Sequence, residues 1–265
     1  MRPGLNATLL ITWHSSCDYP LARYWLKKYG IWFDKIIIYF SQHNIYPQVG
    51  HFVQSDLSSL SNIIFLDPVE YEFGKEDWRA ISVKRMFNYA KGTKWIASIE
   101  QDMLSSDWPR LLIMAREAMN DCDLFGWMNP TNSPYIHPAF FFATWDTLEK
   151  ADYDFTPHPE INGSDHFAMI TYKAKEKGLK IKSLPIGEVS PDSLAFHLGG
   201  INQNYLSGIK SGIFHRPDIF SIYNHHCLWN YGPDHHLEFR NLMMEVKKQL
   251  PYKDEEGEKW NKFFT

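Results

Sequence analysis

Residues 93–112 read TKWIASIEQDMLSSDWPRLL, and the fold prediction starts from this stretch. Its apolar run, Trp95 to Ile99, is typical of a short buried strand. The acidic segment 100–102 (EQD) ends the run, and a helical pattern follows Asp107 and Pro109, two residue types favoured at a helix start. A buried strand followed by a helix is the repeating unit of an α/β domain.

The same order of strand and helix recurs along the chain. Continuous apolar runs, which are typical of strands covered on both faces, alternate with helical patterns. We therefore predict a single Rossmann-like α/β domain with a mostly parallel central sheet, helices on both faces and a C-terminal helix. Strands are expected within 6–16, 36–40, 61–68, 95–99, 122–130 and 179–186, and a strand followed by a helix within 138–150. Further helices are expected within 18–30, 76–92, 107–121, 164–178 (capped by Ser164) and 235–250. The domain should span 1–250, with a flexible tail at 251–265.

Composition narrows the class of protein. The net charge of -4 argues against a wholly basic nucleic-acid binder. Three widely spaced cysteines form neither a zinc pattern nor an even disulfide framework, and no run is apolar enough to cross a membrane. We therefore expect a cytoplasmic protein without a transmembrane segment. The high aromatic content, 16%, fits either a stacking cleft or an aromatic core.

Two carboxylates, Glu100 and Asp102, stand at the end of the predicted strand 95–99. Ligands of open α/β sheets bind beyond the carboxyl ends of the strands. Oxygen ligands two residues apart there could hold Mg²⁺ or Mn²⁺, which commonly bridge substrate phosphates. A solvated strand end explains the same residues equally well.

Other candidate residues also have two interpretations. Asp165 could be a general base or a helix-capping carboxylate, and His197, before two glycines, could be a metal ligand or structural. Arg79 and Arg85 could hold a diphosphate or line a solvated helix face.

The order of these features resembles the GT-A fold of nucleotide-sugar-dependent glycosyltransferases, in particular inverting, family-2-like members. LLITWHSSCDYPLARYWLKKYG and FDKIIIYFS resemble its nucleotide-binding half, and WIASIEQDM resembles its metal-binding strand end. NGSDHF stands at the place of its catalytic-base motif, and FHLGG resembles its late metal-binding histidine. The resemblance covers about residues 8–205. Glu100 stands where the family has its first Asp, and His166 follows Asp165 where the family often has an acidic pair.

The resemblance implies metal-dependent transfer of a hexosyl or pentosyl group from a nucleotide-diphosphate sugar to an acceptor hydroxyl, with inversion. Asp165 would be the base. Asp102 and His197, with Glu100 nearby, would hold Mn²⁺ or Mg²⁺. The nucleotide would bind near Trp13, His14, Ser41, Asp67, Arg79 and Arg85. The sugar or acceptor would meet Gln101, Trp127, His137, His166, Gly199 and Asn204, with Tyr135, Phe140 and Phe141 shaping the site.

Several alternatives stay open at this point. A nucleotidyltransferase would want a glycine-rich, basic loop after the first strand, and TWHSSCDYP (12–20) has neither feature. A non-catalytic module that binds sugar nucleotides is a further possibility. The acceptor could be a glycan, a lipid, a small molecule or DNA with hydroxylated bases, the substrate of phage-type enzymes.

Overall fold

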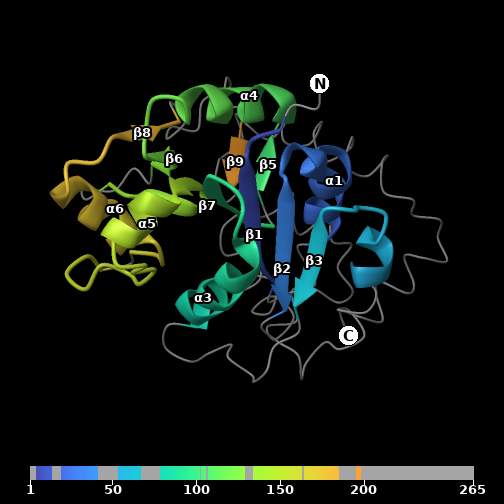
Figure 1. Ribbon diagram of the computed structural model, residues 1–265, viewed down its shortest axis with the longest axis horizontal. Coiled ribbons are helices and arrows are strands. Elements are labelled where there is room, and N and C mark those ends of the chain that lie inside the picture. The colour runs from blue at the N-terminus through green and yellow to red at the C-terminus, as the bar shows by residue number, and fades with distance from the viewer. Residues whose placement is uncertain are drawn as a thin grey trace, which may run out of the picture.

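Strand β1 (Ala7–Trp13) lies inside the central sheet and is buried along nearly its whole length, because helices cover both faces of that sheet. The computed structural model describes residues 4–13, 19–40, 53–66, 78–101, 103–105, 107–128, 134–162, 164–184 and 195–197 (Figure 1).

The described elements follow the predicted alternation of strands and helices. The strands after β1 are β2 (Lys35–Phe40), β3 (Ile63–Leu66), β4 (Trp95–Ile99), β5 (Met103–Ser105), β6 (Leu124–Met128), β7 (Ile136–Thr144), β8 (Ile181–Ser183) and β9 (Ala195–His197). The helices are α1 (Tyr19–Tyr29), α3 (Trp78–Ala90), α4 (Trp108–Ala118), α5 (Trp145–Lys150) and α6 (Ala168–Glu176), with a 3₁₀ turn η1 (Gly30–Trp32) and a helical turn at 53–57.

The central sheet has seven strands in the order β3-β2-β1-β4-β7-β6-β8 (Figure 1). Strands β3, β2, β1 and β4 are parallel to one another, and β6 is parallel to β8. Strand β7 is antiparallel to both of its neighbours, β4 and β6. The predicted mostly parallel α/β sheet is therefore confirmed, with one reversed strand between its two parallel parts.

Alternate residues of each strand serve two separate hydrophobic cores. Leu9 and Ile11 of β1 belong to the core that α1 and α4 complete, whereas Leu10 belongs to the core of α3, α5 and α6. Each such side chain, when fully buried, contributes about 2 kcal/mol from the apolar surface it removes from water. The predicted covering of both faces by helices is confirmed.

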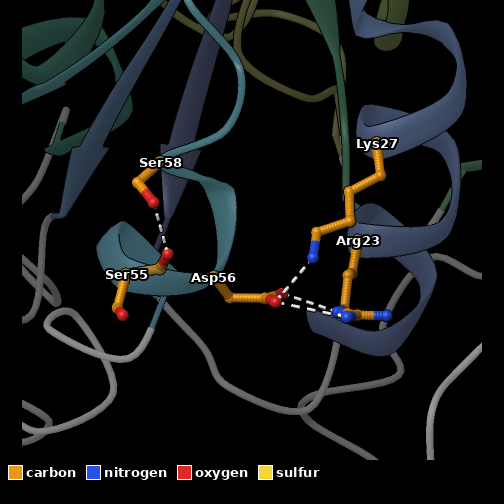
Figure 2. Close-up of polar contacts among 5 residues, drawn as sticks. All are labelled: Arg23, Lys27, Ser55, Asp56 and Ser58. Atoms are coloured by element: carbon orange, nitrogen blue, oxygen red, sulfur yellow. Dashed lines mark hydrogen bonds and ion pairs between the residues drawn. The ribbon is translucent and has the colours of Figure 1, made fainter.

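An ion-pair cluster ties α1 to the segment between β2 and β3. Asp56, in the helical turn 53–57, accepts hydrogen bonds from Arg23 Nε at 2.5 Å and from Lys27 Nζ at 2.6 Å (Figure 2). Arg23 also donates through its Nη2 at 3.2 Å, and the side chains of Arg23 and Asp56 are only 13% and 16% exposed. A second carboxylate, Asp121, binds Lys180 and Lys182 on the surface near β8.

The start of α4 agrees with the sequence, and the start of α6 does not. Asp107 caps α4 by accepting the Arg110 N–H at 3.0 Å, and a proline follows in the first turn. Ser164 does not cap α6, which begins four residues later, at Ala168. Its hydroxyl instead accepts the His158 N–H and donates to the His158 carbonyl, so it closes a turn ahead of the helix.

Two predicted segments near the C-terminus are not among the residues that the structure describes. The C-terminal helix expected at 235–250 and the tail expected at 251–265 lie outside the described residues. Among the helices that the structure describes, none combines the length and apolar character that crossing a membrane requires.

Candidate active site

The site is built at one edge of the sheet. The carboxyl ends of β1, β2, β3 and β4 meet at this edge because these strands are parallel. Strands β4 and β6 are both antiparallel to β7, so the end of β6 and the beginning of β7 lie at the same edge. Residues that are distant in sequence, near 100, 127 and 137, therefore converge there.

The acidic end of β4 is fixed by backbone and side-chain hydrogen bonds. The Glu100 N–H donates to the Ala139 carbonyl of β7 at 3.2 Å, and the Met103 N–H donates back to the Glu100 carbonyl at 3.1 Å. Gln101 is 4% exposed, and its amide donates to the Thr12 carbonyl at 2.6 Å. This bond links the end of β4 to the end of β1, so Gln101 stabilises the backbone at the edge of the site.

A small cavity opens beside this acidic strand end. Its walls come from β1, β4, α3, the start of β7 and the residue before α6, among them Thr12, Val83, Glu100, Gln101, Pro138 and Phe167. Glu100 is half-buried at its rim. The cavity therefore joins the predicted metal-binding strand end to the segment that carries Asp165.

The backbone brings the late histidine next to the acidic strand end. Strand β9 pairs with β5 in a two-stranded antiparallel sheet (Figure 1). In this pairing, Met103 is opposite His197. Residue 197 thus lies across the ladder from the residue that follows Asp102. Within the described ranges, no three His, Cys, Asp or Glu side chains form a cluster that could hold a metal; Asp102 and the side chain of His197 are outside those ranges.

Hydrogen bonds and a close contact to His137 hold Asp165 at this edge. Its carboxylate Oδ1 accepts the His166 N–H at 2.7 Å, and its own N–H donates to the Tyr135 hydroxyl at 2.9 Å. Its Oδ2 is 3.3 Å from Nε2 of His137. The Asp165 side chain is 31% exposed, so it is both anchored and accessible to a substrate.

His137 is far more buried than Asp165. Its side chain is 8% exposed, and its Nδ1 accepts the Ala139 N–H at 3.1 Å. The ring of Trp127 lies 4.8 Å from the His137 ring, and the ring of Tyr135 lies 6.2 Å from it. The predicted role of His137 was sugar or acceptor binding, and its contact with Asp165 was not predicted.

The chain reaches α6 through a strained residue. Phe167 has φ of 77°, a left-handed conformation that is costly for a bulky side chain. Edge-to-face contacts with Phe141 at 4.9 Å and Phe155 at 4.7 Å hold its ring in the core. This packing fixes the direction in which the chain leaves Asp165 and His166.

Aromatic residues near the site divide into core and edge. Phe140 and Phe141 are completely buried, so the prediction that they shape an acceptor site is wrong. Their side chains fill the two cores on either side of β7. Trp127 is half-buried at the end of β6 and remains a candidate for sugar contact.

The predicted nucleotide side of the site is described in part. The Trp13 ring is 3% exposed and packs on Phe40, 6.4 Å away, within the core. Arg85 donates to the Tyr39 hydroxyl at 3.3 Å, close to the end of β2. The other nucleotide candidates lie outside the described residues: His14, Ser41, Asp67 and the side chain of Arg79. The same holds for Gly199 and Asn204, which are sugar or acceptor candidates, so all these roles stay predictions.

Comparison with known proteins identifies the fold. No protein-family model and no curated protein matches the chain. The mannosyltransferase PcManGT from Pyrobaculum calidifontis, solved with GDP-Man and Mn²⁺, has a TM-score of 0.50 at 11% identity, covering 94% of this chain and 78% of its own.

Two further solved structures match less closely. The 1-349 fragment of S. aureus TarS has a TM-score of 0.47 at 10% identity, covering 92% of this chain and 72% of its own. GalNAc-T7 with UDP, GalNAc and Mn²⁺ has a TM-score of 0.46 at 11% identity, covering 68% of this chain and 41% of its own. At such low identity the likeness to PcManGT concerns the fold: a single α/β domain of GT-A-like, Rossmann-type architecture.

Proposed function

We propose that this protein is a metal-dependent glycosyltransferase that moves a hexosyl or pentosyl group from a nucleotide-diphosphate sugar to an acceptor hydroxyl, with inversion. The observation that carries the proposal is the anchored Asp165 carboxylate at the sheet edge where β1, β2, β3 and β4 end. The GT-A-like fold supports it, and PcManGT, which shares this fold, was solved with a sugar nucleotide and Mn²⁺.

Asp102, His197 and Glu100 would hold Mn²⁺ or Mg²⁺. The pairing of Met103 with His197 supports this set, because it brings the two segments to one place. Two carboxylates and an imidazole are also a donor set that suits these cations, Mn²⁺ in particular. A bound divalent cation would neutralise the diphosphate of the donor.

The protein side chains would divide the remaining tasks. His14, Ser41, Asp67, Arg79 and Arg85 would bind the nucleotide. His166, next to Asp165 in the chain, and Trp127, whose ring lies 4.8 Å from that of His137, would contact the sugar or the acceptor. The chemical class of the acceptor is left to experiment.

Asp165 would act as the single general base. It takes the proton from the acceptor hydroxyl while the hydroxyl oxygen forms a bond to the anomeric carbon. The bond from that carbon to the diphosphate oxygen breaks, and its electron pair leaves with the nucleoside diphosphate. One displacement without a covalent intermediate inverts the anomeric configuration, by analogy with inverting glycosidases.

The first test is release of nucleoside diphosphate from a panel of sugar nucleotides, measured with and without Mn²⁺. The wild type should release it from at least one donor and only with the cation. An Asp102→Asn variant should lose about 10-fold or more of its Mn²⁺-dependent affinity for the donor. Asp107→Asn is the matched control, because asparagine still caps α4 and the residue is outside the site.

Two outcomes would overturn these assignments. Release at the wild-type rate by Asp102→Asn would remove Asp102 from the metal site. A wild type that releases nucleoside diphosphate from no donor, with either cation and a mixed set of acceptors, would contradict the proposed function.

A further inference from the structure

His137 lies at an irregularity in the ladder between β6 and β7. Gly126 is opposite Phe141, but the next pairing joins Met128 to Ile136, so β7 carries extra residues at this point. Pro138 cannot donate to a ladder, and a proline inside a strand is typical of such a bulge. The bulge takes His137 out of the regular alternation at the sheet edge.

Gly126 makes this bulge possible. A Cβ atom at position 126 would lie 2.1 Å from the Phe140 carbonyl oxygen and 2.6 Å from Ile136 Cγ2. Only glycine allows β7 to approach β6 this closely. The sequence of β6 and β7 therefore fixes the backbone on which His137 is carried.

The two ring nitrogens of His137 have different tasks. Nδ1 accepts the Ala139 N–H, so the ring proton is on Nε2. Nε2 faces Oδ2 of Asp165 at 3.3 Å. The His137 ring is 8% exposed, and so little water competes with its contact to the carboxylate.

Asp165 is therefore approached by a donor at each carboxylate oxygen. The His166 N–H binds Oδ1 at 2.7 Å, and His137 Nε2 faces Oδ2. Loss of the His137 contact would weaken the hold on Oδ2 and so loosen the orientation of the carboxylate.

We infer that His137 is a positioning residue that holds Asp165 in the orientation needed to take the acceptor proton. The inference rests on the proposed function of Asp165 as the base. In this role His137 acts through the position of its ring, with Nδ1 bound to the Ala139 backbone and Nε2 facing Asp165. Its effect is on the geometry of the base, where a misplacement of about 1 Å can cost on the order of 100-fold in rate.

Two substitutions separate positioning from a role in the bulge alone. In His137→Gln, the amide nitrogen occupies the place of Nε2 and can still donate to Asp165, but the acceptor for Ala139 is lost. In His137→Asn, the shorter side chain can still accept the Ala139 N–H but cannot reach Asp165. Turnover of a sugar nucleotide should fall by about 10- to 100-fold in His137→Asn, through kcat and without a rise in the donor KM. His137→Gln should keep kcat within about 10-fold of the wild type.

The tautomer gives a second readout that is independent of activity. Nitrogen NMR of the wild type should show hydrogen on Nε2 and none on Nδ1, and Asp165→Asn should shift the Nε2 resonance. Melting curves of both His137 variants confirm that each is folded.

The outcomes separate this inference from the proposed function. Wild-type kcat in His137→Asn, or a His137 that carries hydrogen on Nδ1, overturns the positioning role while the glycosyltransferase proposal stands. A wild type that turns over no sugar nucleotide overturns the proposed function and the positioning role with it.

Discussion

The two halves of the sheet contribute to the candidate site in different ways. In the parallel half, β1 to β4, the strands are regular, and residues at or just beyond their ends, such as Trp13 and Gln101, serve the core or cross-link strands. The other half consists of β7, β6 and β8, and we call it the antiparallel half because β7 runs against both of its neighbours. In this half, β7 itself is irregular, and its residue His137 contacts Asp165. At the ends of the regular strands, the segments that follow the strands lie at the site. In the bulged strand β7, a side chain of the strand itself lies at the site.

The largest expected effect is that of replacing Asp165, which contacts the antiparallel half through His137. Replacing Asp165 by Asn removes the base but keeps the size of the side chain. We expect kcat to fall by about 10²- to 10⁴-fold, with unchanged Mn²⁺-dependent binding of the nucleoside diphosphate, because the donor would be held by the parallel half. Steady-state kinetics and calorimetry on the same preparation measure both quantities.

Asp154→Asn is the control for this substitution. Asp154 is in the same segment but binds Lys173 and Thr156, and its pKa is lowered by these hydrogen bonds in spite of a burial effect that raises it. Its substitution should leave kcat near the wild-type value. If Asp165→Asn also kept wild-type turnover, Asp165 would not be the base.

The next effect, on stability, compares a glycine from each half. In Gly126→Ala the new methyl group would meet the Phe140 backbone at 2.1 Å, and we expect a loss of about 1–3 kcal/mol in the free energy of unfolding. In Gly30→Ala it would meet only side-chain ends, Ile36 Cδ1 at 3.0 Å and Leu60 Cδ1 at 3.8 Å, and the Ile36 side chain can move. Denaturant titration should therefore show a smaller loss for Gly30→Ala, of under about 1 kcal/mol.

An equal loss for the two glycine variants would show that the β6–β7 bulge tolerates a Cβ and is not fixed by Gly126. The kcat of Gly126→Ala adds a second readout, since a displaced bulge should also lower turnover. Gly30 is in η1, at the opposite end of β2 from the site, so Gly30→Ala should leave turnover unchanged.

The smallest expected effect compares two ion-pair clusters. Asp56→Asn weakens a largely buried link between α1 and the segment before β3, and should cost about 1 kcal/mol in the free energy of unfolding. Asp121 is exposed beside Lys180 and Lys182, whose hydrogen bonds lower its pKa to about 2. Its ion pairs would lose any stabilising effect as the pH falls through 3.8 towards 2, and at neutral pH we expect no resolvable change for Asp121→Asn.

Denaturant titrations in low and high salt measure these two effects. The deficit of Asp56→Asn should persist in high salt, because buried pairs are screened less than surface pairs. A larger deficit for Asp121→Asn than for Asp56→Asn would contradict this ranking by burial.

The fold could be predicted from the sequence because it depends on local hydrophobic pattern. Continuous apolar runs such as 36–40 and 95–99 are typical of strands in a helix-covered parallel sheet, where both faces are buried. The start of α6 could not be predicted in this way. Ser164 has the pattern of a cap, but aromatic contacts hold Phe167 in a left-handed conformation and delay the helix.

The meeting of the strand ends at one edge of the sheet could be predicted from the parallel strand order, whereas the roles of Asp165 and of the strand-end residues stay predictions. The contact between His137 and Asp165 could not be predicted. His137 and Asp165 are 28 residues apart and meet only because β7 is bulged. The sequence does carry one signal, Pro138 within an apolar run, which is typical of a bulge. No local pattern tells which side chain such a bulge turns towards the site.

The central claim, a single displacement with Asp165 as base, is tested most directly by the anomeric configuration of the product. Proton NMR of the sugar released to water or an acceptor, read before mutarotation, compares it with the configuration in the donor. We expect inversion in the wild type and the loss of this product in Asp165→Asn. Retention of configuration, or inverted product formed at the wild-type rate by Asp165→Asn, would contradict it.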